Sequence, residues 1–460
     1  MPYNLVARAT GKTITLTPLS EAGLDDWLKK ADKRIAAWVG AADFDASSGA
    51  ILLLPGKDGG IVGALLGVNG DDDVWSWSAA VEALPPGRYA IPKRTGAKQA
   101  NNAALGWALG TYAFDRYKKV ARPEAELVWP AKADRDAVEG MASSIALTRD
   151  LINTPASDLG PAELAAAARK LAREFRARCS VIVGDDLLKK NYPMVHAVGR
   201  ASDQAPRLID IVWGNPRHPK VTLVGKGVCF DSGGLDLKPA SGMKLMKKDM
   251  GGAANALGLA RMIMSAKLPV RLRVLVPAVE NSVSGDAFRP LDVLDSRAGI
   301  TVEIGNTDAE GRLILGDALY EAASEDPELI LDFATLTGAA RVALGPELPV
   351  LFANDDTLAG DLSKYGEAAG DPVWRLPLWK PYRRTMDSKI ADINNIGEMA
   401  QGGAIIAALF LDEFVKDTVP WAHFDIIAWN TSSRPGRPAG GEAMAIRAAF
   451  GTIAARFGKG

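Results

Sequence analysis

Short apolar runs rich in β-branched residues alternate with segments of helical periodicity along the chain beyond residue 178. Six runs predict strands, at 179–183, 208–213, 221–224, 270–276, 329–333 and 421–426. Three intervening segments predict helices, at 252–266, 317–323 and 404–415. Continuous apolar strands separated by helices are typical of a sheet that helices cover on both faces. We therefore predict an α/β fold that binds its ligands at the carboxyl ends of the strands.

The first part of the chain predicts a smaller α/β domain. Apolar runs at 51–54 and 61–66 predict buried strands, and 99–118 predicts a helix. An earlier helix, with Ser20 as its N-cap, is indicated by apolar residues at helical spacing. These residues are Leu24, Trp27, Leu28, Ala31, Ile35 and Trp38. The region has neither paired carboxylates nor a histidine and cysteine cluster, so the sequence assigns no chemistry to it.

A helical stretch at 135–152 follows this region. Asn153-Thr154-Pro155 ends it, because proline disfavours the helical conformation in the residue before it. Pro161 then begins another predicted helix that continues to residue 178. We predict an accessory domain over 1–132, a linker helix over 133–156 and a catalytic domain over 157–460.

Composition and charge disfavour a nucleic-acid-binding, disulfide-rich, secreted or membrane-spanning protein. The net charge of −1 disfavours binding of nucleic acid through a global positive field. The two cysteines, Cys179 and Cys229, are too few for a disulfide framework. The first 13 residues lack the apolar core of a signal peptide, and no apolar run is long enough to span a membrane. We expect a cytoplasmic protein with no membrane partner.

Glycine-rich turns carry the candidate chemical groups. Between residues 224 and 252, Lys226, Asp231, Lys238 and Asp249 lie among closely spaced glycines, which let a backbone approach a ligand. The Gly-Lys-Gly at 225–227 is not a phosphate-binding loop, because that motif needs Ser or Thr after the lysine. The chain has only three histidines, so a metal site here would be built mainly from carboxylates.

A second segment, Asn-Thr-Asp-Ala-Glu-Gly-Arg-Leu at 306–313, adds two more carboxylates. In an extended backbone the side chains of Asp308, Glu310 and Arg312 would point the same way. Such a group is costly to assemble unless cations and an anionic partner lie between its members. Two divalent cations held by carboxylates can polarise a carbonyl and activate a water. A lysine beside them can act as a neutral amine ligand, and a second, charged lysine can stabilise an oxyanion.

Several segments together resemble the leucyl aminopeptidase family of dinuclear metallo-exopeptidases. They are 153–155, 225–234, 249–252, 306–313, 334–338 and 421–423, so the resemblance covers about 150–460. It implies a smaller, macrodomain-like N-terminal α/β domain. It also implies a C-terminal catalytic domain of the zinc exopeptidase type, with a mixed sheet flanked by helices, and a homohexameric assembly.

The resemblance implies roles for individual residues. Two divalent ions, zinc or manganese, would be bound by five side chains, which are Lys226, Asp231, Asp249, Asp308 and Glu310. Asp231 and Glu310 match the bridging ligands, Lys226 and Asp249 match the tighter site, and Asp308 matches the more exchangeable one.

The substrate contacts follow from the same resemblance. Lys238 matches the lysine that contacts the substrate carbonyl, and Arg312 matches the arginine that holds a bicarbonate as general base. Met246 and Thr335 match residues that line the pocket for the N-terminal side chain. Backbone contacts to the substrate are expected from two further positions, Leu336 and Gly338.

These residues predict an enzyme that releases N-terminal residues, with a leucine-like preference, from peptide substrates. The alternative is a regulatory or DNA-binding scaffold with the same hexameric assembly. Three side chains also have simpler interpretations. Met246 would fill the core, and His423 would be a core histidine. Cys229, at a position where relatives commonly carry threonine, would be a small buried apolar residue.

Overall fold

The computed structural model describes residues 3–9 and 11–458, and the chain forms two compact units. Unit 1 contains the residues up to Ala146 together with Ser432–Ala439, and unit 2 contains Leu147–Thr431 and the residues from Gly440 onward. The segment on which we predict the absence of a signal peptide includes Met1, Pro2 and Thr10, which lie outside the described residues.

The division between the units falls inside one long helix, α5 (Arg135–Asn153). This helix confirms the predicted helical stretch at 135–152 and ends directly before Thr154 and Pro155. The predicted division into 1–132, 133–156 and 157–460 stays a prediction. Within the described part of the chain, no helix is both long enough and apolar enough to cross a membrane.

Unit 1 is built on a mixed six-stranded sheet in the order β1-β6-β5-β2-β4-β3. Its strands are β1 (Leu5–Val6), β2 (Thr13–Leu19), β3 (Ile51–Pro55), β4 (Ile61–Gly67), β5 (Gly87–Ala90) and β6 (Ala125–Val128). Its helices before α5 are α1 (Glu21–Leu28), α2 (Lys33–Ala41), α3 (Trp75–Ala83) and α4 (Ala97–Gly110). Its core contains the fully buried Trp77, Tyr89 and Trp107, which come from α3, β5 and α4.

Two helix predictions for unit 1 are wrong in their extent. The predicted helix from Leu24 to Trp38 is two helices, because Asp32 caps the second through bonds from the N–H groups of Arg34 and Ile35. Ser20 precedes α1 but its side chain makes no capping hydrogen bond. The helix predicted at 99–118 ends at Gly110, where the Thr111 hydroxyl donates to the Ala108 carbonyl at 2.8 Å and replaces a helical bond. The strands predicted at 51–54 and 61–66 are confirmed.

Unit 2 is built on a mixed nine-stranded sheet in the order β16-β15-β18-β14-β9-β11-β8-β7, with β10 paired to β11. Its strands are β7 (Arg178–Val183), β8 (Arg207–Trp213), β9 (Lys220–Gly225), β10 (Gly227–Asp231), β11 (Arg271–Asn281), β14 (Leu329–Ala334), β15 (Val350–Ala353), β16 (Trp374–Arg375) and β18 (Trp421–Asp425). The four central strands β18, β14, β9 and β11 are parallel, and β10 is parallel to β11, so their carboxyl ends share one edge.

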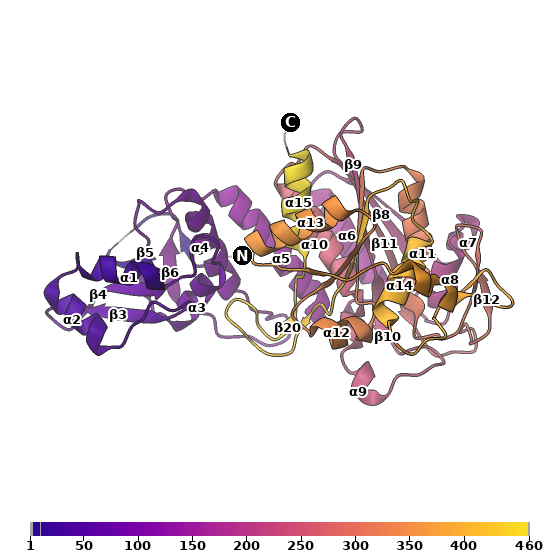
Figure 1. Ribbon diagram of the computed structural model, residues 1–460, viewed down its shortest axis with the longest axis horizontal. Helices are drawn as coiled ribbons and strands as arrows, with labels where there is room; N and C mark the ends of the chain where they lie inside the picture. Colours follow the sequence, from indigo (N-terminus) through magenta and orange to yellow (C-terminus); the bar gives the residue numbers. More distant parts are fainter. Residues whose placement is uncertain (1–2, 10, 459–460) are drawn as a thin grey trace. The chain divides into compact units, whose positions relative to one another are not determined.

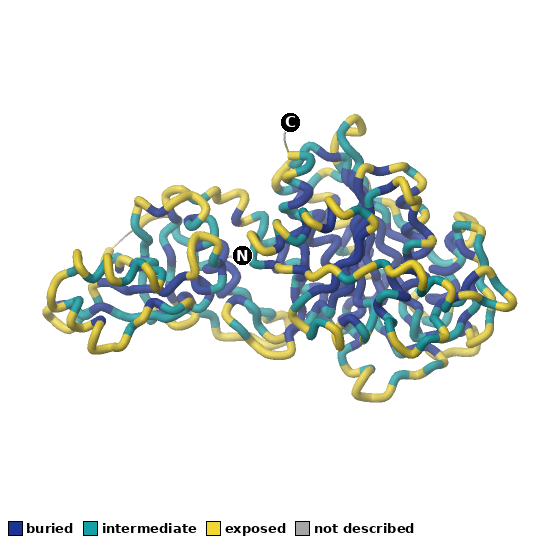
Figure 2. The backbone as a smooth tube through the Cα atoms, viewed as in Figure 1, coloured by how far each residue is buried: buried dark blue, intermediate teal, exposed yellow. Residues whose placement is uncertain are grey.

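Helices cover both faces of this sheet, as the sequence predicts. The helices α10 (Gly251–Ser265), α13 (Asp356–Ala368) and α15 (Ile446–Phe457) lie on one side of β8, β9 and β11 (Figure 1). The helices α8 (Pro193–Gly199), α11 (Glu310–Ser324) and α14 (Gly403–Asp412) lie on the other side (Figure 1). The strands between them are buried along most of their length (Figure 2).

The remaining helices and small sheets complete unit 2. The helices are α6 (Pro161–Glu174), α7 (Asp186–Lys189), α9 (Ala240–Met243) and α12 (Gly338–Leu344), and the 3-10 helices are η1 (Ala156–Asp158), η2 (Met246–Met250) and η3 (Lys380–Met386). Two small sheets contain β12 (Val293–Asp295), β13 (Thr301–Glu303) and β17 (Ile393–Asn394), and β19 (Trp429–Asn430) and β20 (Gly440–Gly441).

All six strands predicted for unit 2 are present, and β11 continues five residues past its predicted end. The helix predicted to continue to residue 178 stops at Glu174. The helix predicted at 317–323 begins seven residues earlier, at Glu310, which changes the local structure of the candidate site.

Candidate metal centre

The candidate residues collect at the shared carboxyl edge of the parallel strands. Lys226 directly follows β9, Asp231 ends β10, and Thr335 directly follows β14. Because these strands run in the same direction, three segments distant in sequence deliver their polar side chains to one place. Asp249 in η2 and Glu310 at the start of α11 complete the group.

Lys226 lies at the centre of the cluster and is buried. Its Nζ lies 2.7 Å from Asp249 Oδ2 and 3.0 Å from Glu310 Oε1, and it donates to the Thr335 carbonyl at 3.1 Å. Burial opposes its charge, but Asp249 and Glu310 hold the pKa of Lys226 above its usual value. The same ammonium lowers the pKa of Asp249, although burial opposes that shift.

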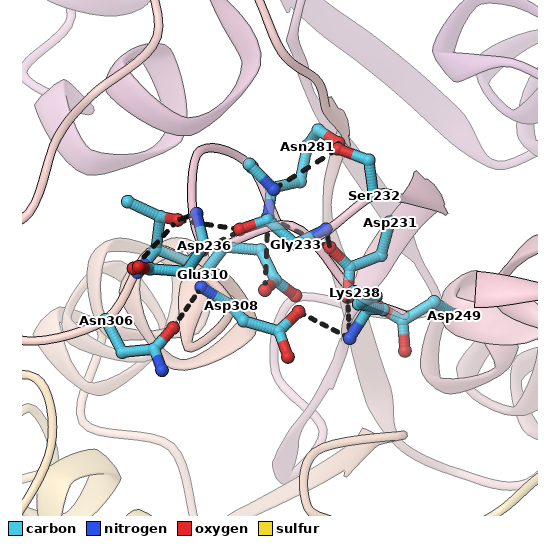
Figure 3. A network of polar contacts seen from close by, with 12 residues as sticks. Asp231, Ser232, Gly233, Asp236, Lys238, Asp249, Asn281, Asn306, Asp308 and Glu310 are labelled. Carbon is cyan, nitrogen blue, oxygen red and sulfur yellow. Dashed lines mark hydrogen bonds and ion pairs between the residues drawn. The ribbon is translucent and has the colours of Figure 1, made fainter. Parts of the chain in front are cut away.

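Lys238 makes the second set of ion pairs. Figure 3 shows its amine between the carboxylates of Asp231 and Asp308. Its Nζ lies 2.8 Å from Asp231 Oδ2 and in direct contact with Asp308 Oδ1. Burial opposes the charge, and Asp231 nevertheless raises the pKa of Lys238 above its usual value. Lys238 is therefore an ammonium at neutral pH.

The carboxylates outnumber the amines that neutralise them. Four acidic side chains meet two lysines, so the group carries two negative charges in excess if every acid ionises. This excess of negative charge contributes to raised pKa values in two of the acids. Burial is the larger cause and the neighbouring Asp231 the next, and together they raise the pKa of Glu310 to about 8. Burial and then Asp249 raise the pKa of Asp231 to about 6. Added positive charge between these groups would relieve both shifts.

The donor atoms fit divalent cations. One carboxylate oxygen from each of Asp231, Asp308 and Glu310 lies within 4.8 Å of the other two. Within the described part of the chain, three buried oxygens accept no hydrogen bond although a lysine amine faces each of them. They are Asp249 Oδ2, Asp308 Oδ1 and Glu310 Oε1. Hard carboxylate oxygens with spare acceptor capacity, together with one amine, suit two metal ions.

The prediction that Asp308, Glu310 and Arg312 follow an extended backbone is wrong. Asp308 lies in a turn, and Glu310 and Arg312 belong to the first turn of α11. Arg312 is therefore rotated away from Glu310 around the helix axis. Its Nη1 donates to the Asn395 carbonyl at 2.7 Å, and its buried Nε has no hydrogen-bond partner among the described residues. Burial lowers the pKa of Arg312 to about 10.

Two glycines allow the close approach that this cluster requires. A Cβ on Gly252 would lie 2.1 Å from the Phe333 carbonyl oxygen and 2.8 Å from the Lys226 nitrogen. A Cβ on Gly311 would lie 2.5 Å from Lys226 Cε. A larger residue at 252 would displace α10 from the strand ends, because its Cβ meets backbone atoms, and a larger residue at 311 would displace the end of the Lys226 side chain.

Sequence analysis missed the polar residues that hold the acids in place. Asn281, at the end of β11, donates through Nδ2 to Asp231 Oδ1 at 2.9 Å, to the Thr307 carbonyl at 3.1 Å and to Glu310 Oε2 at 3.4 Å. The hydroxyl of Thr307 donates to the Gly233 carbonyl at 2.6 Å. An asparagine after a long apolar strand, at the edge where ligands bind, is the one sequence signal that could have identified Asn281.

Asn395 performs a similar function for the second segment. Its Oδ1 accepts from the N–H groups of Gly305 and Asn306 at 2.8 and 3.2 Å, and its Nδ2 donates to the Asn306 carbonyl at 2.8 Å. Its carbonyl also accepts from Arg312, so one buried residue fixes both the acidic turn and the guanidinium.

A cavity of about 430 Å³ opens onto the centre. Met246, Thr335, Leu336 and Gly338 all line it, together with Lys226, Lys238 and Arg312. The metal-ligand candidates and the substrate-contact candidates therefore lie at one cavity. Glu310 does not line it but contacts Lys226, which does.

Asp425, at the end of β18, shapes one wall of this cavity. Its Oδ1 accepts from the N–H groups of Leu336 and Thr337 at 3.1 Å each, and its Oδ2 accepts from the Thr337 hydroxyl at 2.6 Å. The hydroxyl of Thr337 in turn accepts from the Ala340 N–H and caps α12. Sequence analysis missed Asp425 as well.

Two further cations line the cavity. Lys248, in η2, is buried beside Asp249, and Arg341, in α12, is exposed. Burial lowers the pKa of Lys248 to about 8.

The remaining candidates lie in the core. His423 is fully buried in β18 and lies 2.6 Å from Asp332 Oδ1, which fits its interpretation as a core histidine. Cys229 is buried in β10, and burial raises the pKa of its thiol well above the usual value. It behaves as a small buried apolar residue.

Comparison with known proteins places this centre in a family. Residues 146–450 match the model of the cytosol aminopeptidase family, catalytic domain, and residues 14–130 match that of the M17 aminopeptidase, N-terminal domain. A probable cytosol aminopeptidase of Roseiflexus castenholzii is 44% identical over 361 residues, which are 74% of this chain and 73% of that protein.

Solved structures agree over nearly the whole chain. The cytosol aminopeptidase of Coxiella burnetii is 49% identical with a TM-score of 0.93, and the match covers 99% of both chains. The bottromycin maturation enzyme BotP in complex with Mn is 34% identical with a TM-score of 0.87, covering 96% of this chain and 99% of that one. These named relatives are enzymes, and nothing in them supports the alternative of a DNA-binding scaffold. The chain therefore belongs to the cytosol aminopeptidase family of metal-dependent aminopeptidases.

Proposed function

We propose that five side chains hold two divalent cations, with zinc or manganese as the native ions. The ligands are Lys226, Asp231, Asp249, Asp308 and Glu310. Asp231 and Glu310 would be shared by the two ions, Lys226 and Asp249 would belong to the tighter site, and Asp308 would belong to the more exchangeable one. The observation that carries this proposal is the convergence of the oxygens of Asp231, Asp308 and Glu310 within 4.8 Å. The manganese complex of BotP supports a similar loading here.

When bound, the ions would polarise the scissile carbonyl and activate a water molecule. The residues of the chain supply the rest of the chemistry. Lys238 stays protonated, because its pKa lies above the usual value, and it donates to the negative charge that develops on the carbonyl oxygen. Arg312 would hold a bicarbonate through its Nε, which has no partner within the described residues, and this anion would supply the general base.

We propose that the cavity binds the first residue of a peptide. Met246 and Thr335 line the pocket for its side chain, for which we expect a leucine-like preference. Leu336 and Gly338 contact the peptide backbone. The Leu336 N–H is already donated to Asp425, so the carbonyl of Leu336 is the group offered to the substrate. The free α-amino group lies at the carboxylate cluster.

Two further proposals concern the setting of the enzyme. The names of the relatives support a cytoplasmic location, and the family resemblance supports a homohexamer. Sedimentation of the purified protein near six times the 48.7 kDa chain mass would support the hexamer, and sedimentation at the chain mass would contradict it.

The decisive experiment measures hydrolysis of aminoacyl p-nitroanilides by metal-stripped protein before and after Mn²⁺ or Zn²⁺ is added. We expect release only with metal, fastest with leucine-like residues, and none from N-acetylated substrates. Absence of release with every metal and residue would refute the proposal.

The variant Glu310→Ala tests the ligand assignment. We expect kcat/KM to fall by more than about 100-fold, because even residues that only orient metal ligands typically cost 10–100-fold. The control is Glu367→Ala, which removes an exposed carboxylate from α13 and should leave activity unchanged. Full activity of Glu310→Ala in excess metal would contradict the assignment.

A further inference from the structure

Lys248 is a buried cation without a partner. Its residue is 3% exposed, and its amine makes no hydrogen bond or ion pair with any part of the chain that the structure describes. The adjacent Asp249 is already paired with Lys226 at 2.7 Å. Leaving a buried charge uncompensated is costly, because the protein interior does not replace the hydration that the ammonium gives up.

Arg341 adds a second cation to the same cavity. It lies in α12, and the Asp425–Thr337 contacts fix the start of this short helix. Among the described residues its guanidinium also has no hydrogen bond or ion pair, and both Arg341 and Lys248 line the cavity. A guanidinium presents a planar set of donors that matches a carboxylate.

The other cations of the cavity are already engaged. Lys226 and Lys238 each contact two carboxylates, and Arg312 donates to the Asn395 carbonyl. Lys248 and Arg341 are therefore the two lining cations, among the described residues, that have no contacting partner. Their charges are available to an anionic group of the bound molecule.

We propose that Lys248 and Arg341 form a subsite for a carboxylate of the substrate, separate from the metal ligands. This inference rests on the proposed function, because a peptide supplies only two kinds of carboxylate. One is an acidic side chain, and the other is the free C-terminus of a very short peptide. The subsite makes the enzyme favour peptides that present one of these groups near the scissile bond.

The test compares four dipeptide probes on the metal-loaded enzyme. The ratio of kcat/KM for Glu-Ala amide to that for Gln-Ala amide measures the effect of a side-chain carboxylate. The ratio for Leu-Ala to Leu-Ala amide measures the effect of a C-terminal carboxylate. We expect one ratio to reach about 10-fold or more in the wild type, as a hydrogen bond to a charged group can provide.

Three variants assign this preference to residues. Lys248→Met keeps the aliphatic stem and removes the charge, and Arg341→Gln changes an exposed residue, so we expect it to leave the fold intact. Both should reduce the ratio, to about 2-fold or less for Lys248→Met. Lys244→Met removes an exposed lysine that does not line the cavity, and it should leave both ratios unchanged. If Lys248→Met does not fold, Arg341→Gln alone decides the assignment.

The outcomes separate this inference from the proposed function. Hydrolysis of Leu-Ala amide with both ratios near one would overturn the carboxylate subsite and leave the aminopeptidase intact. A high wild-type ratio that neither Lys248→Met nor Arg341→Gln lowers would also overturn it. If none of the probes is hydrolysed, the proposed function fails. Calorimetric binding of the same four peptides to wild type and variants then decides whether the carboxylate is recognised.

Discussion

Asn281→Leu is the substitution that best tests how the two proposed bridging carboxylates are held. Leucine has nearly the shape of asparagine but cannot donate a hydrogen bond. It removes the Nδ2 contacts to Asp231 at 2.9 Å, to the Thr307 carbonyl at 3.1 Å and to Glu310 at 3.4 Å. The backbone carbonyl of Asn281, which accepts from Ser232, stays in place.

The size of the effect follows from these contacts. An amide carries two N–H protons, so the bonds to Asp231 and Thr307 use both, and the 3.4 Å contact to Glu310 contributes little. The bond to Asp231 is charge-assisted, so its loss should lower the free energy of unfolding by about 1.5–3 kcal/mol. Asp231 also becomes free to turn, and we expect about 10–100-fold weaker metal binding.

The assay measures Mn²⁺ affinity of the stripped protein by competition with a chelator, together with unfolding by denaturant. The control is Asn354→Leu, because Asn354 also makes two part-buried hydrogen bonds, to the Val419 carbonyl at 3.0 Å and from the Trp421 N–H at 2.8 Å. It should lose stability but keep its metal affinity to within about 2-fold, since it lies at the other end of the strands. Wild-type metal affinity in Asn281→Leu would refute the reasoning.

Two more predictions concern buried charges. Asp332→Asn should lower the free energy of unfolding by about 3–5 kcal/mol, because it leaves the buried His423 without its anionic partner. Burial opposes the charge of His423 but Asp332 raises its pKa, so this stabilisation is complete below the unfolded pKa and lost as pH rises through the folded one. The deficit of the variant should therefore shrink in alkaline denaturation experiments, and a constant deficit would contradict the pairing. Metal binding at pH 7 should release protons, because Lys226 is charged and Glu310, with a pKa of about 8, is largely protonated before either becomes a ligand. Calorimetry in buffers of different ionisation enthalpy counts these protons, and a count of zero would contradict the ligand set.

The sequence was sufficient to predict six of the nine strands in the sheet of unit 2 and the edge that carries the site, but not β10, β15 or β16. Continuous apolar runs such as 221–224 and 329–333 predict strands by themselves, because a strand buried on both faces is apolar along nearly its whole length. Lys226 follows one of these runs and Thr335 follows the other closely, so their meeting could be expected from parallel topology.

Local structure at the acidic segment could not be predicted in the same way. Gly311 and Gly316 weaken the helical signal over the first turns of α11, and Ala309 at the N-cap offers no side-chain acceptor. The helix begins at Glu310 because tertiary contacts stabilise it, and propensity alone would start it later. The two-residue spacing of Asp308, Glu310 and Arg312 therefore suggested an extended backbone, whereas the last two residues belong to a helix.

The supporting polar residues lie beyond sequence analysis for a different reason. Asn281 and Asn395 are separated from Glu310 and Arg312 by 29 and 83 positions, and each is a single amide with no local pattern around it. Their importance comes from the buried acceptors that they satisfy, and those acceptors exist only when the chain is folded. A pattern in sequence identifies ligands more readily than the groups that orient them.

Lys226 can occupy its position because two neighbouring glycines, Gly252 and Gly311, have no side chain. Its amine can reach Asp249 and Glu310 only because Gly252 and Gly311 have no Cβ, which would come within 2.1 Å of the Phe333 carbonyl oxygen and 2.5 Å of Lys226 Cε. One glycine brings α10 against the strand ends, and the other opens the first turn of α11 to the lysine stem. Each glycine also weakens its own helix, by up to about 1 kcal/mol relative to alanine. That cost is offset by the packing of the two helices against the sheet. The same packing brings the carboxylates to Lys226, so the fold and the carboxylate cluster depend on each other.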